Sequence, residues 1–451
     1  MFKKFTNGCV ELVQKYLPDP FLFAIVLTIL VFILGITATG QGPIKMVAHW
    51  GNGVWSLLAF SMQMTLVLVT GHTMASAPVM RKGLTELASI PKTPTQAIFA
   101  VSLISAIACW INWGFGLVIG ALYARELAKQ IKKVDYRLLI AAAYSGFLVW
   151  HAGISGSIPL ILATPGEALS EATLGAVVEA IPTTQTIFSL FNLIISAAII
   201  IALSLINSAM HPKEEDVYEI DPKLLEDPEQ EVIVTKVVMT SAEKMENSPV
   251  LSMITGILGI AYIIYHFSTN GFDLNLNIVN LIFLIVGIIL HGTPRRYLNA
   301  LQEAVKGAGG IILQFPFYAG IMGMMTGKSE LGVSLAGQMS HMFVSISTQA
   351  TYPLFTFLSA GLVNFFVPSG GGQWAVQAPI MMPAGLQLGV DSAVTGMAIA
   401  WGDAWTNMIQ PFWALPALGI AGLGARDIMG YCLVDLLISG VIICAGFLIL
   451  V

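Results

Sequence analysis

Long apolar runs recur along the chain, and most have the length that an α-helix needs to cross a bilayer. A membrane-spanning helix takes about 20 residues, because each residue adds about 1.5 Å along the helix axis. The pattern therefore predicts an all-α, polytopic membrane protein. Its spans are expected near 20–39, 56–80, 138–163, 186–208, 249–267, 272–291, 308–327, 392–420 and 429–450.

Two further apolar stretches contain residues that interrupt helices. Residues 94–124 include NWGFG (112–116), and residues 348–385 include NFFVPSGGGQW (364–374). Such Pro, Ser and Gly runs normally mark exposed loops, yet no Lys or Arg lies between Lys328 and Arg426. Irregular backbone at membrane depth is tolerated only where it is buried in protein or lines a water-filled cavity. We therefore predict two re-entrant hairpins, each with its tip at one of these motifs.

The order of these elements repeats along the chain. A shift of 252 residues places 20–39 on 272–291, 56–80 on 308–332 and 94–124 on 346–376, and it aligns Asn112 with Asn364. A matched order of elements indicates an internal repeat. We predict a first repeat over 1–208, an acidic solvent-exposed loop over 209–248, a connecting transmembrane helix at 249–267, and a second, inverted repeat over 272–451.

The basic residues suggest how the two repeats are oriented. Cytoplasmic flanks of membrane spans are enriched in Lys and Arg. The first hairpin has basic residues on both sides, whereas the second has none within twenty residues of either end; those of the first are Arg81, Lys82, Lys92, Arg125, Lys129, Lys132, Lys133 and Arg137. One unpaired helix between the halves would invert the second. Inverted repeats with broken helices that meet near the midplane are typical of secondary transporters, built from a scaffold and a transport domain.

Composition agrees with a membrane protein and excludes a nucleic-acid partner. The chain has 451 residues, of which 56% are hydrophobic and 10% charged, against about 25% charged in soluble domains. The net charge of −5 comes from the loop 209–248, which holds 11 acidic residues and 4 lysines. The four cysteines show no CxxC spacing, and no metal site is expected beyond Na⁺.

The hairpin tips supply the candidate substrate site. Glycines let backbone approach a ligand closely, and helix N-termini bind anions without a cationic side chain. The predicted substrate-binding residues are Asn112, Trp113, Gly114, Phe115 and Gly116 at the first tip, and Asn364, Pro368, Ser369, Gly370, Gly371, Gly372, Gln373 and Trp374 at the second. We expect a carboxylate at the N–H groups, and its alkyl tail against Trp113, Phe115, Phe366 and Trp374.

A second set of residues could hold a coupling ion. Pro159 and Pro411 should break the spans that follow the hairpins, and a broken helix frees carbonyl groups for a cation. The ion-coupling candidates are Ser155, Ser157, Asp403, Asn407 and Gln410, and weaker candidates are Gln63, His72, His151 and Gln314. An ionisable residue in a span is a functional hypothesis by default. The alternatives are interhelical hydrogen bonds for the amides, an interface position for Asp403, and plain packing for the histidines.

Signatures of enzymes are absent from the chain. It contains no HExxH, no GxSxG and no P-loop, which argues against a hydrolase and against an ATP-driven pump. No enzymatic activity is therefore predicted.

Several longer stretches resemble the bacterial short-chain fatty acid transporter family, of the acetoacetate/butyrate permease type. They are KYLPDPFLFA, WGNGVWSLLAFSMQMTLVLVTGH, INWGFGLVIGALYARE, NFFVPSGGGQWAVQAP and QPFWALPALGIAGLGARDIMGYC, and they run from about residue 15 to residue 433. The resemblance implies uptake of small monocarboxylates across the bacterial inner membrane. It also implies membership of the wider ion-transporter superfamily, whose members often form homodimers.

The sequence leaves other functions open. Coupling to Na⁺ or H⁺ by alternating access is the favoured prediction, and no other cofactor is expected. A passive carboxylate uniporter or channel, a carrier of other small organic anions, and a membrane-embedded enzyme are the alternatives, of which the last lacks any catalytic set of residues.

Overall fold

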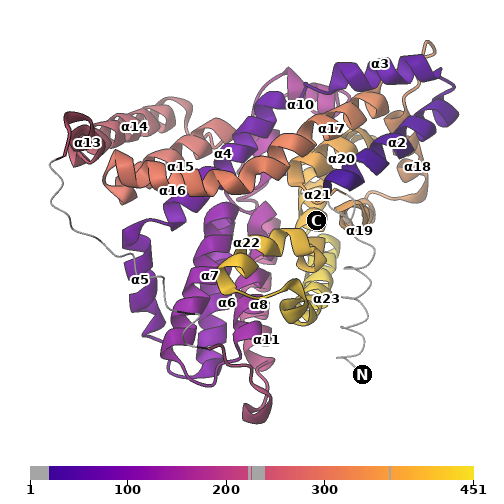
Figure 1. Cartoon of the computed structure of the whole chain (residues 1–451). Coiled ribbons are helices and arrows are strands. Elements are labelled where there is room, and N and C mark those ends of the chain that lie inside the picture. The colour runs from indigo at the N-terminus through magenta and orange to yellow at the C-terminus, as the bar shows by residue number, and fades with distance from the viewer. Residues whose placement is uncertain (1–19, 222–224, 226–238, 365–366) are drawn as a thin grey trace.

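The structure is a computed structural model that describes residues 20–221, 225, 239–364 and 367–451, and every regular element among them is helical (Figure 1). The first half of the chain contains α2 (Pro20–Thr39), α3 (Pro43–Gly53), α4 (Leu58–Ala75), α5 (Pro78–Ala88), α6 (Pro94–Ile111), α7 (Trp113–Gln130), α8 (Tyr136–Ser145), η1 (Gly146–Ala152), α9 (Ser157–Ala163), α10 (Glu167–Ala172), α11 (Leu190–Ala209) and η2 (Glu214–Asp216). The second half contains α13 (Ser241–Glu246), α14 (Pro249–Asn270), α15 (Leu276–His291), α16 (Pro294–Val305), η3 (Lys306–Ala308), α17 (Gly309–Thr326), α18 (Leu335–Ile346), α19 (Tyr352–Asn364), α20 (Gly370–Gln387), α21 (Ser392–Thr406), η4 (Asn407–Ile409), α22 (Pro411–Ala421) and α23 (Ala425–Ile449).

The predicted all-α membrane architecture is confirmed. Six helices among the described residues are long and apolar enough to cross a bilayer, or seven if the bent pair α16–α17 forms one span. Two predicted spans differ in extent. The stretch 56–80 is cut at Ser76 and Ala77 into α4 and α5, and the stretch 272–291 becomes the 16-residue helix α15. Pro78 at the first turn of α5 accounts for the cut, because the residue before a proline is disfavoured in the helical conformation.

Exposed apolar side chains mark the surface that would meet lipid. On α14 the side chains of Ile257 and Leu258 are 60% and 68% exposed, although the helix is strongly apolar. Water would penalise such a surface by about 25 cal/mol per Å², whereas lipid tails do not. Two groups of helices stand out in Figure 1, one with α2–α4 and α14–α17 and one with α6–α8, α11 and α23. Their assignment as scaffold and transport domain stays a prediction.

The element order recurs at the predicted offset of 252 residues. Helices α2 to α7 have α15 to α20 as counterparts, and the interrupted segment α8–η1–α9 has α21–η4–α22. The packing also exchanges partners, because α2 packs against α17 while α4 packs against α15. A shift of 252 residues places α2 on α15 and α4 on α17. The contact between α2 and α17 therefore corresponds to the contact between α15 and α4. An internal two-fold axis exchanges contacts in this way. Among the long helices α14 has no counterpart, and the inverted orientation of the halves stays a prediction.

Helices are interrupted at four places, all close to predicted positions. In the first hairpin α6 ends at Ile111 and α7 begins at Trp113, so the hairpin extends to Gln130 and not to residue 124. In the second, α19 ends at Asn364 and α20 begins at Gly370. With 18 residues, α6 is about 27 Å long and could cross the hydrocarbon core. A re-entrant path for this hairpin therefore stays a prediction.

The two broken spans open just before their prolines. Residues 153–156 separate η1 from α9, and Gln410 separates η4 from α22. Pro159 lies in the first turn of α9 and Pro411 begins α22. A proline fits the first helical turn, where its missing N–H group has no helical partner to lose. The prediction of two broken spans is confirmed, and each proline lies in the first turn of the second half-helix.

Accessibility of single cysteines tests the orientation of the first hairpin. On a background without native cysteines, residues 85–92 between α5 and α6 are expected to be labelled from the cytoplasmic face only, because basic residues flank this loop. Cysteines at Gln349 and Thr351, before α19, are expected to react from outside. Labelling of residues 85–92 by a membrane-impermeant reagent added outside would reject the inverted repeat.

Candidate functional site

The two halves of the chain meet at a buried pair of ionisable residues. The Nδ1 atom of His151 lies 2.9 Å from Oδ2 of Asp403, and both side chains are almost completely buried. His151 ends the segment α8–η1, and Asp403 lies near the end of α21. Their separation of 252 residues equals the repeat offset. Equivalent positions of two related halves touch only beside the axis that relates them, so this pair lies at the centre of the fold.

Hydrogen bonding fixes the tautomer of His151. Its Nε2 atom accepts the backbone N–H of Ile158 at 3.0 Å, and an N–H group can only donate. The proton of the neutral ring therefore resides on Nδ1, which donates to Asp403. Trp150 stacks on the imidazole with 4.1 Å between ring centroids. His151 is thus a fixed, neutral donor to a carboxylate, and its role as an ion-coupling residue stays a prediction.

The tip of the second hairpin rests directly on this pair. A Cβ atom on Gly370 would lie 2.7 Å from Cε1 of His151, 2.8 Å from Oγ of Ser157 and 2.9 Å from Trp150. These separations are shorter than normal contacts, so only glycine fits without a shift of its neighbours. The structure therefore brings together one predicted substrate-site residue, Gly370, and three ion-site candidates, His151, Ser157 and Asp403.

The neighbouring glycines are required for space and not for an unusual backbone. A Cβ atom on Gly371 would lie 2.3 Å from Phe60, and one on Gly372 would lie 2.6 Å from Tyr318. Both residues belong to the first turn of α20 and neither has a positive φ. Glycine is therefore not required at these positions by a left-handed backbone. Close approach of α20 to α4 and α17 is what excludes larger residues here.

The tip of the first hairpin is closed by its own cap. Asn112 is fully buried, and its Oδ1 atom accepts the N–H of Phe115 at 2.8 Å. The N–H of Trp113 donates to Oγ of Ser155 at 3.0 Å, and the N–H of Gly116 donates to the carbonyl of Asn112. Three of the N–H groups that were predicted to bind an anion are therefore occupied. A Cβ atom on Gly114 would meet the backbone of α4 at 2.9 Å.

Aromatic side chains connect the two tips. The Trp113 ring makes edge contacts with Trp150 at 5.8 Å and Trp413 at 5.4 Å between centroids. Trp413 donates its Nε1–H to the carbonyl of Pro368 at 3.1 Å. Trp374, on α20, is buried as well. Trp113 of the first tip therefore contacts Trp413, which bonds to the second tip, and Phe366 falls outside the described residues.

Amide side chains join α19 to the broken end of α21. The Nδ2 atom of Asn364 lies 2.8 Å from the carbonyl of Asp403 and 2.8 Å from Oδ1 of Asn407. Gln410 donates to the carbonyl of Asn364 at 3.0 Å. The carbonyl that the break frees at Asn407 accepts the hydroxyl of Tyr144 at 2.6 Å. The predicted candidates Asn364, Asn407 and Gln410 thus form one network, although one freed carbonyl already has a partner.

Among the described polar groups of α19, α20, α21 and η4, the Nδ2 donor of Asn407 beside Asp403 lacks an acceptor, and three acceptor oxygens lack a hydrogen-bond donor. These oxygens are Oδ1 of Asp403, Oδ1 of Asn364 and Oε1 of Gln373, and all three side chains are fully buried. Buried polar atoms are nearly always paired, and an unpaired one costs about 1–3 kcal/mol. Acceptors that lack donors are the ligands that a hard cation takes.

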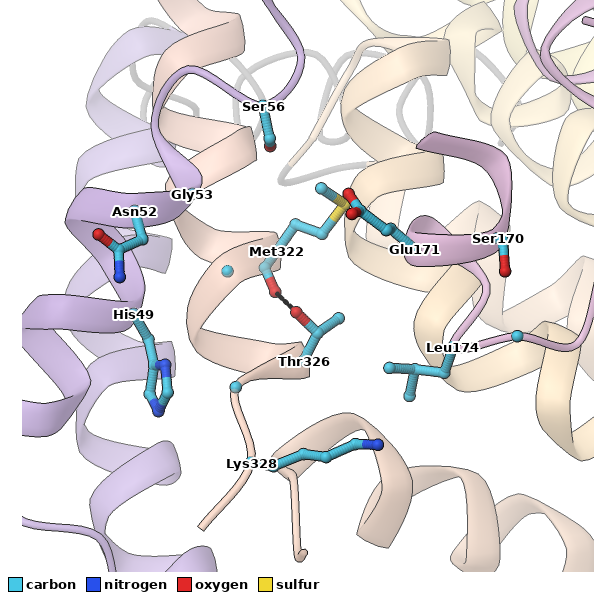
Figure 2. Close-up of a pocket in the computed structure, with 13 residues that line it drawn as sticks. His49, Asn52, Gly53, Ser56, Ser170, Glu171, Leu174, Met322, Thr326 and Lys328 are labelled. Carbon is cyan, nitrogen blue, oxygen red and sulfur yellow. Dashed lines mark hydrogen bonds between the residues drawn. The ribbon is translucent and has the colours of Figure 1, made fainter. Parts of the chain in front are cut away.

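A cavity lined by polar and apolar residues lies between α3, α10 and α17 (Figure 2). Its volume is about 480 Å³, and its lining includes His49, Asn52, Glu171, Met322 and Lys328. Figure 2 shows His49 and Asn52 on one side and Glu171 and Leu174 on the other.

One face of α17 links this cavity to the tip. Phe315 and Tyr318 contact the tip glycines Gly371 and Gly372, and Met322 lines the cavity one turn further on. These positions are three and four residues apart, so they share a helix face. The cavity therefore opens within about one helical turn of the tip.

Some predicted residues lie elsewhere. Gln63 bonds to Asn277 at 2.7 Å where α4 packs on α15, and half-buried His72 lies one turn before the end of α4, near Glu303. Gln314 is one layer outside the centre, since it accepts the hydroxyl of Tyr318 at 3.3 Å. Gln63 thus bonds between helices and Gln314 bonds within its own helix, and neither contacts the His151–Asp403 pair in any described hydrogen bond.

One buried acidic residue was missed from the sequence. Asp435 lies in the predicted span 429–450, here α23, and is fully buried. The signal was available, because an acidic residue within an apolar span is unusual. The apolar character of the whole run concealed it.

The described geometry defines a class of protein before any comparison is made. Apolar helices of membrane-spanning length surround two interrupted helix pairs that meet at a buried polar centre, which is the construction of a membrane transporter. Comparison with known families then gives the particular one. The short chain fatty acid transporter family matches residues 1–450, so the chain belongs to this family.

Full-length relatives support the assignment. A protein of Escherichia coli K12 described as a short-chain fatty acid transporter is 47% identical over 447 residues, with 99% of both chains covered. A protein of Haemophilus influenzae with the same description is 46% identical over 452 residues, again with 99% of both covered. Since these relatives are named as transporters, they point to a non-enzymatic function.

A solved structure shares the fold. The YdaH transporter of Alcanivorax borkumensis superposes with a TM-score of 0.55 at 15% sequence identity, and the match covers 96% of this chain and 97% of that one. That crystal structure was described as having an unusual topology. At this identity the likeness concerns the fold alone.

Proposed function

We propose that the protein is a secondary active transporter that takes up short-chain monocarboxylates such as butyrate or acetoacetate across the bacterial inner membrane. Cation coupling by alternating access and a homodimeric assembly belong to the same proposal. The observation that carries it is the close approach of the Gly370 tip to Ser157 and to His151, which in turn contacts the Asp403 carboxylate. A helix N-terminus, which favours an anion, thereby lies beside a carboxylate and unpaired oxygens, which favour a cation.

The second tip is the better carboxylate site of the two. Gly372 and Gln373 donate their N–H groups to Ser369, whereas the described residues offer no acceptor to the N–H groups of Gly370 and Gly371. On α7 the cap and Ser155 already occupy the corresponding groups. We therefore place the substrate carboxylate at Gly370 and Gly371. The alkyl tail would face the aromatic residues between the tips, Trp113 and Trp413, and Trp374 of α20.

The coupling cation would be held by the unpaired oxygens of Asp403, Asn364 and Gln373. These three oxygens come from α21, α19 and the start of α20, and they would supply part of the oxygen coordination that a hard cation needs. This set of ligands favours Na⁺ over H⁺ as the coupling ion. One cation would balance the charge of the Asp403 carboxylate beside neutral His151, and a bound monocarboxylate would leave the loaded centre with a charge of −1. The cavity at Met322 would give the substrate access along α17, with Lys328 at its rim attracting anions.

Uptake into proteoliposomes tests the proposal. With labelled butyrate outside, an inward Na⁺ gradient is expected to drive accumulation above the external concentration, and excess unlabelled acetoacetate is expected to reduce it. Liposomes without protein control for passive entry of the acid. Saturable counterflow without accumulation under either a Na⁺ or a proton gradient would reject coupling and indicate a uniporter. Absence of saturable butyrate uptake would reject the substrate.

A further inference from the structure

A second buried carboxylate lies away from the substrate centre and has no hydrogen-bond donor. Neither oxygen of Asp435 has a partner among the described residues, and the side chain is fully buried. Transfer of an ionised carboxylate into a low-dielectric interior is so costly that such a group normally neutralises. The Asp435 carboxylate therefore requires either a cation or a proton.

The polar neighbour of Asp435 is the amide of Asn207, whose N–H groups bond to two serine hydroxyl groups. Asn207, on α11, lies beside the carboxyl group and is itself fully buried. Its two N–H bonds are taken by Oγ of Ser102 at 3.1 Å and Oγ of Ser145 at 3.0 Å. Its Oδ1 atom has no partner. One added proton on Asp435 would therefore supply a donor for an orphaned acceptor, so that two unpaired groups become one hydrogen bond.

The surroundings hold no charged group that could replace this proton. On α23 itself the Cys432 thiol lies one turn away. Helices α11 and α22, which pack against α23, carry no ionisable residue. On the other packed helices the ionisable side chains have other partners: Tyr136, Tyr144 and Tyr352 donate to backbone carbonyls, Arg137 pairs with Asp427, and Asp403 pairs with His151. A metal cation would need more oxygens than Asp435 and Asn207 offer.

We propose that Asp435 is a proton-binding site, separate from the substrate centre, that holds its proton while α23 is packed against α11. The O–H bond forms with a proton taken from water on one side of the membrane. It breaks when the α11–α23 contact opens to the other side and the carboxylate becomes hydrated. This proposal rests on the proposed function. It adds one proton, which would cross the membrane together with the substrate carboxylate and the cation bound at Asp403.

Two measurements on Asp435→Asn test the site, with Asp391→Asn as the matched control. Asparagine imitates the neutral acid, and Asp391 is an exposed helix cap at which asparagine is equally favourable. In the first measurement, infrared spectra of the protein in bilayers are expected to lose one protonated-carboxyl C=O band in Asp435→Asn and none in the control. This readout does not depend on transport. An unchanged set of protonated-carboxyl bands in Asp435→Asn would overturn the proposal.

The second measurement follows butyrate uptake as the external pH is varied at a fixed Na⁺ gradient, after subtraction of entry into protein-free liposomes. In Asp435→Asn the pH dependence is expected to disappear while butyrate exchange and Na⁺ dependence remain. Loss of Na⁺ dependence with retained pH dependence would assign Asp435 to a metal cation and overturn the proton site. If no variant transports butyrate, the proposed function fails, and the infrared result still decides whether Asp435 carries a proton.

Discussion

Gly370→Ala is expected to reduce transport between about tenfold and about a hundredfold while the protein still folds and inserts. The added methyl group would lie 2.7 Å from His151 and 2.8 Å from Ser157. Overpacking of this kind costs about 1–3 kcal/mol, and each 1.4 kcal/mol changes an equilibrium about tenfold. The tip would be pushed away from the His151–Asp403 pair, so the arrangement that binds carboxylate and cation together would be less populated.

The control is Gly419→Ala, because a Cβ atom on Gly419 of α22 meets nothing within 4 Å. Alanine is the better helix former at such a position, so uptake of this variant should equal that of the wild type. Both variants are compared by initial rates of labelled butyrate uptake, normalised to the inserted protein, and by thermal unfolding. Wild-type uptake by Gly370→Ala would remove the tip from the site.

The sequence predicted the interruptions of the helices better than the contacts between them. Asn112, Ser369 and the glycines at 370–372 mark helix starts because their chemistry is local: a cap side chain bonds to an N–H group two or three residues ahead. Pro159 and Pro411 also mark helix starts through local chemistry, because a proline fits the first turn of a helix and not its interior. Such signals are readable without any knowledge of the rest of the fold.

The contacts of the centre depend on which helices meet, which no local pattern encodes. From the sequence His151 is only a weaker candidate, because an isolated histidine on an apolar segment usually serves packing. Its importance arises from Asp403, which lies 252 residues away. The repeat offset could have shown this, since it relates the two positions directly. The bond that occupies the Trp113 N–H at the first tip was equally hidden, because Ser155 lies 42 residues further along the chain, in the break between η1 and α9.

Asp403→Asn is expected to lower gradient-driven accumulation of butyrate at least about tenfold and to leave exchange largely intact. The asparagine oxygen can still accept the Nδ1–H of His151, so the 2.9 Å contact and the local packing are retained. The negative charge is lost, however, and with it the attraction for a cation at the unpaired Oδ1. A tenfold loss corresponds to about 1.4 kcal/mol of coupling between cation and substrate.

Separate Na⁺ and proton gradients identify the ion that acts at Asp403. If the centre holds Na⁺, Asp403→Asn loses accumulation driven by the Na⁺ gradient and keeps the pH dependence assigned to Asp435. The double variant Asp403→Asn, His151→Gln should then be no worse than the more impaired single variant, because residues that act as a unit are not additive. Unchanged accumulation in Asp403→Asn would show that the pair is structural. The oxygens of Asn364 and Gln373 would then have to hold the cation without a carboxylate. Two neutral ligands bind a cation only weakly, so the centre would keep only its site for the substrate anion.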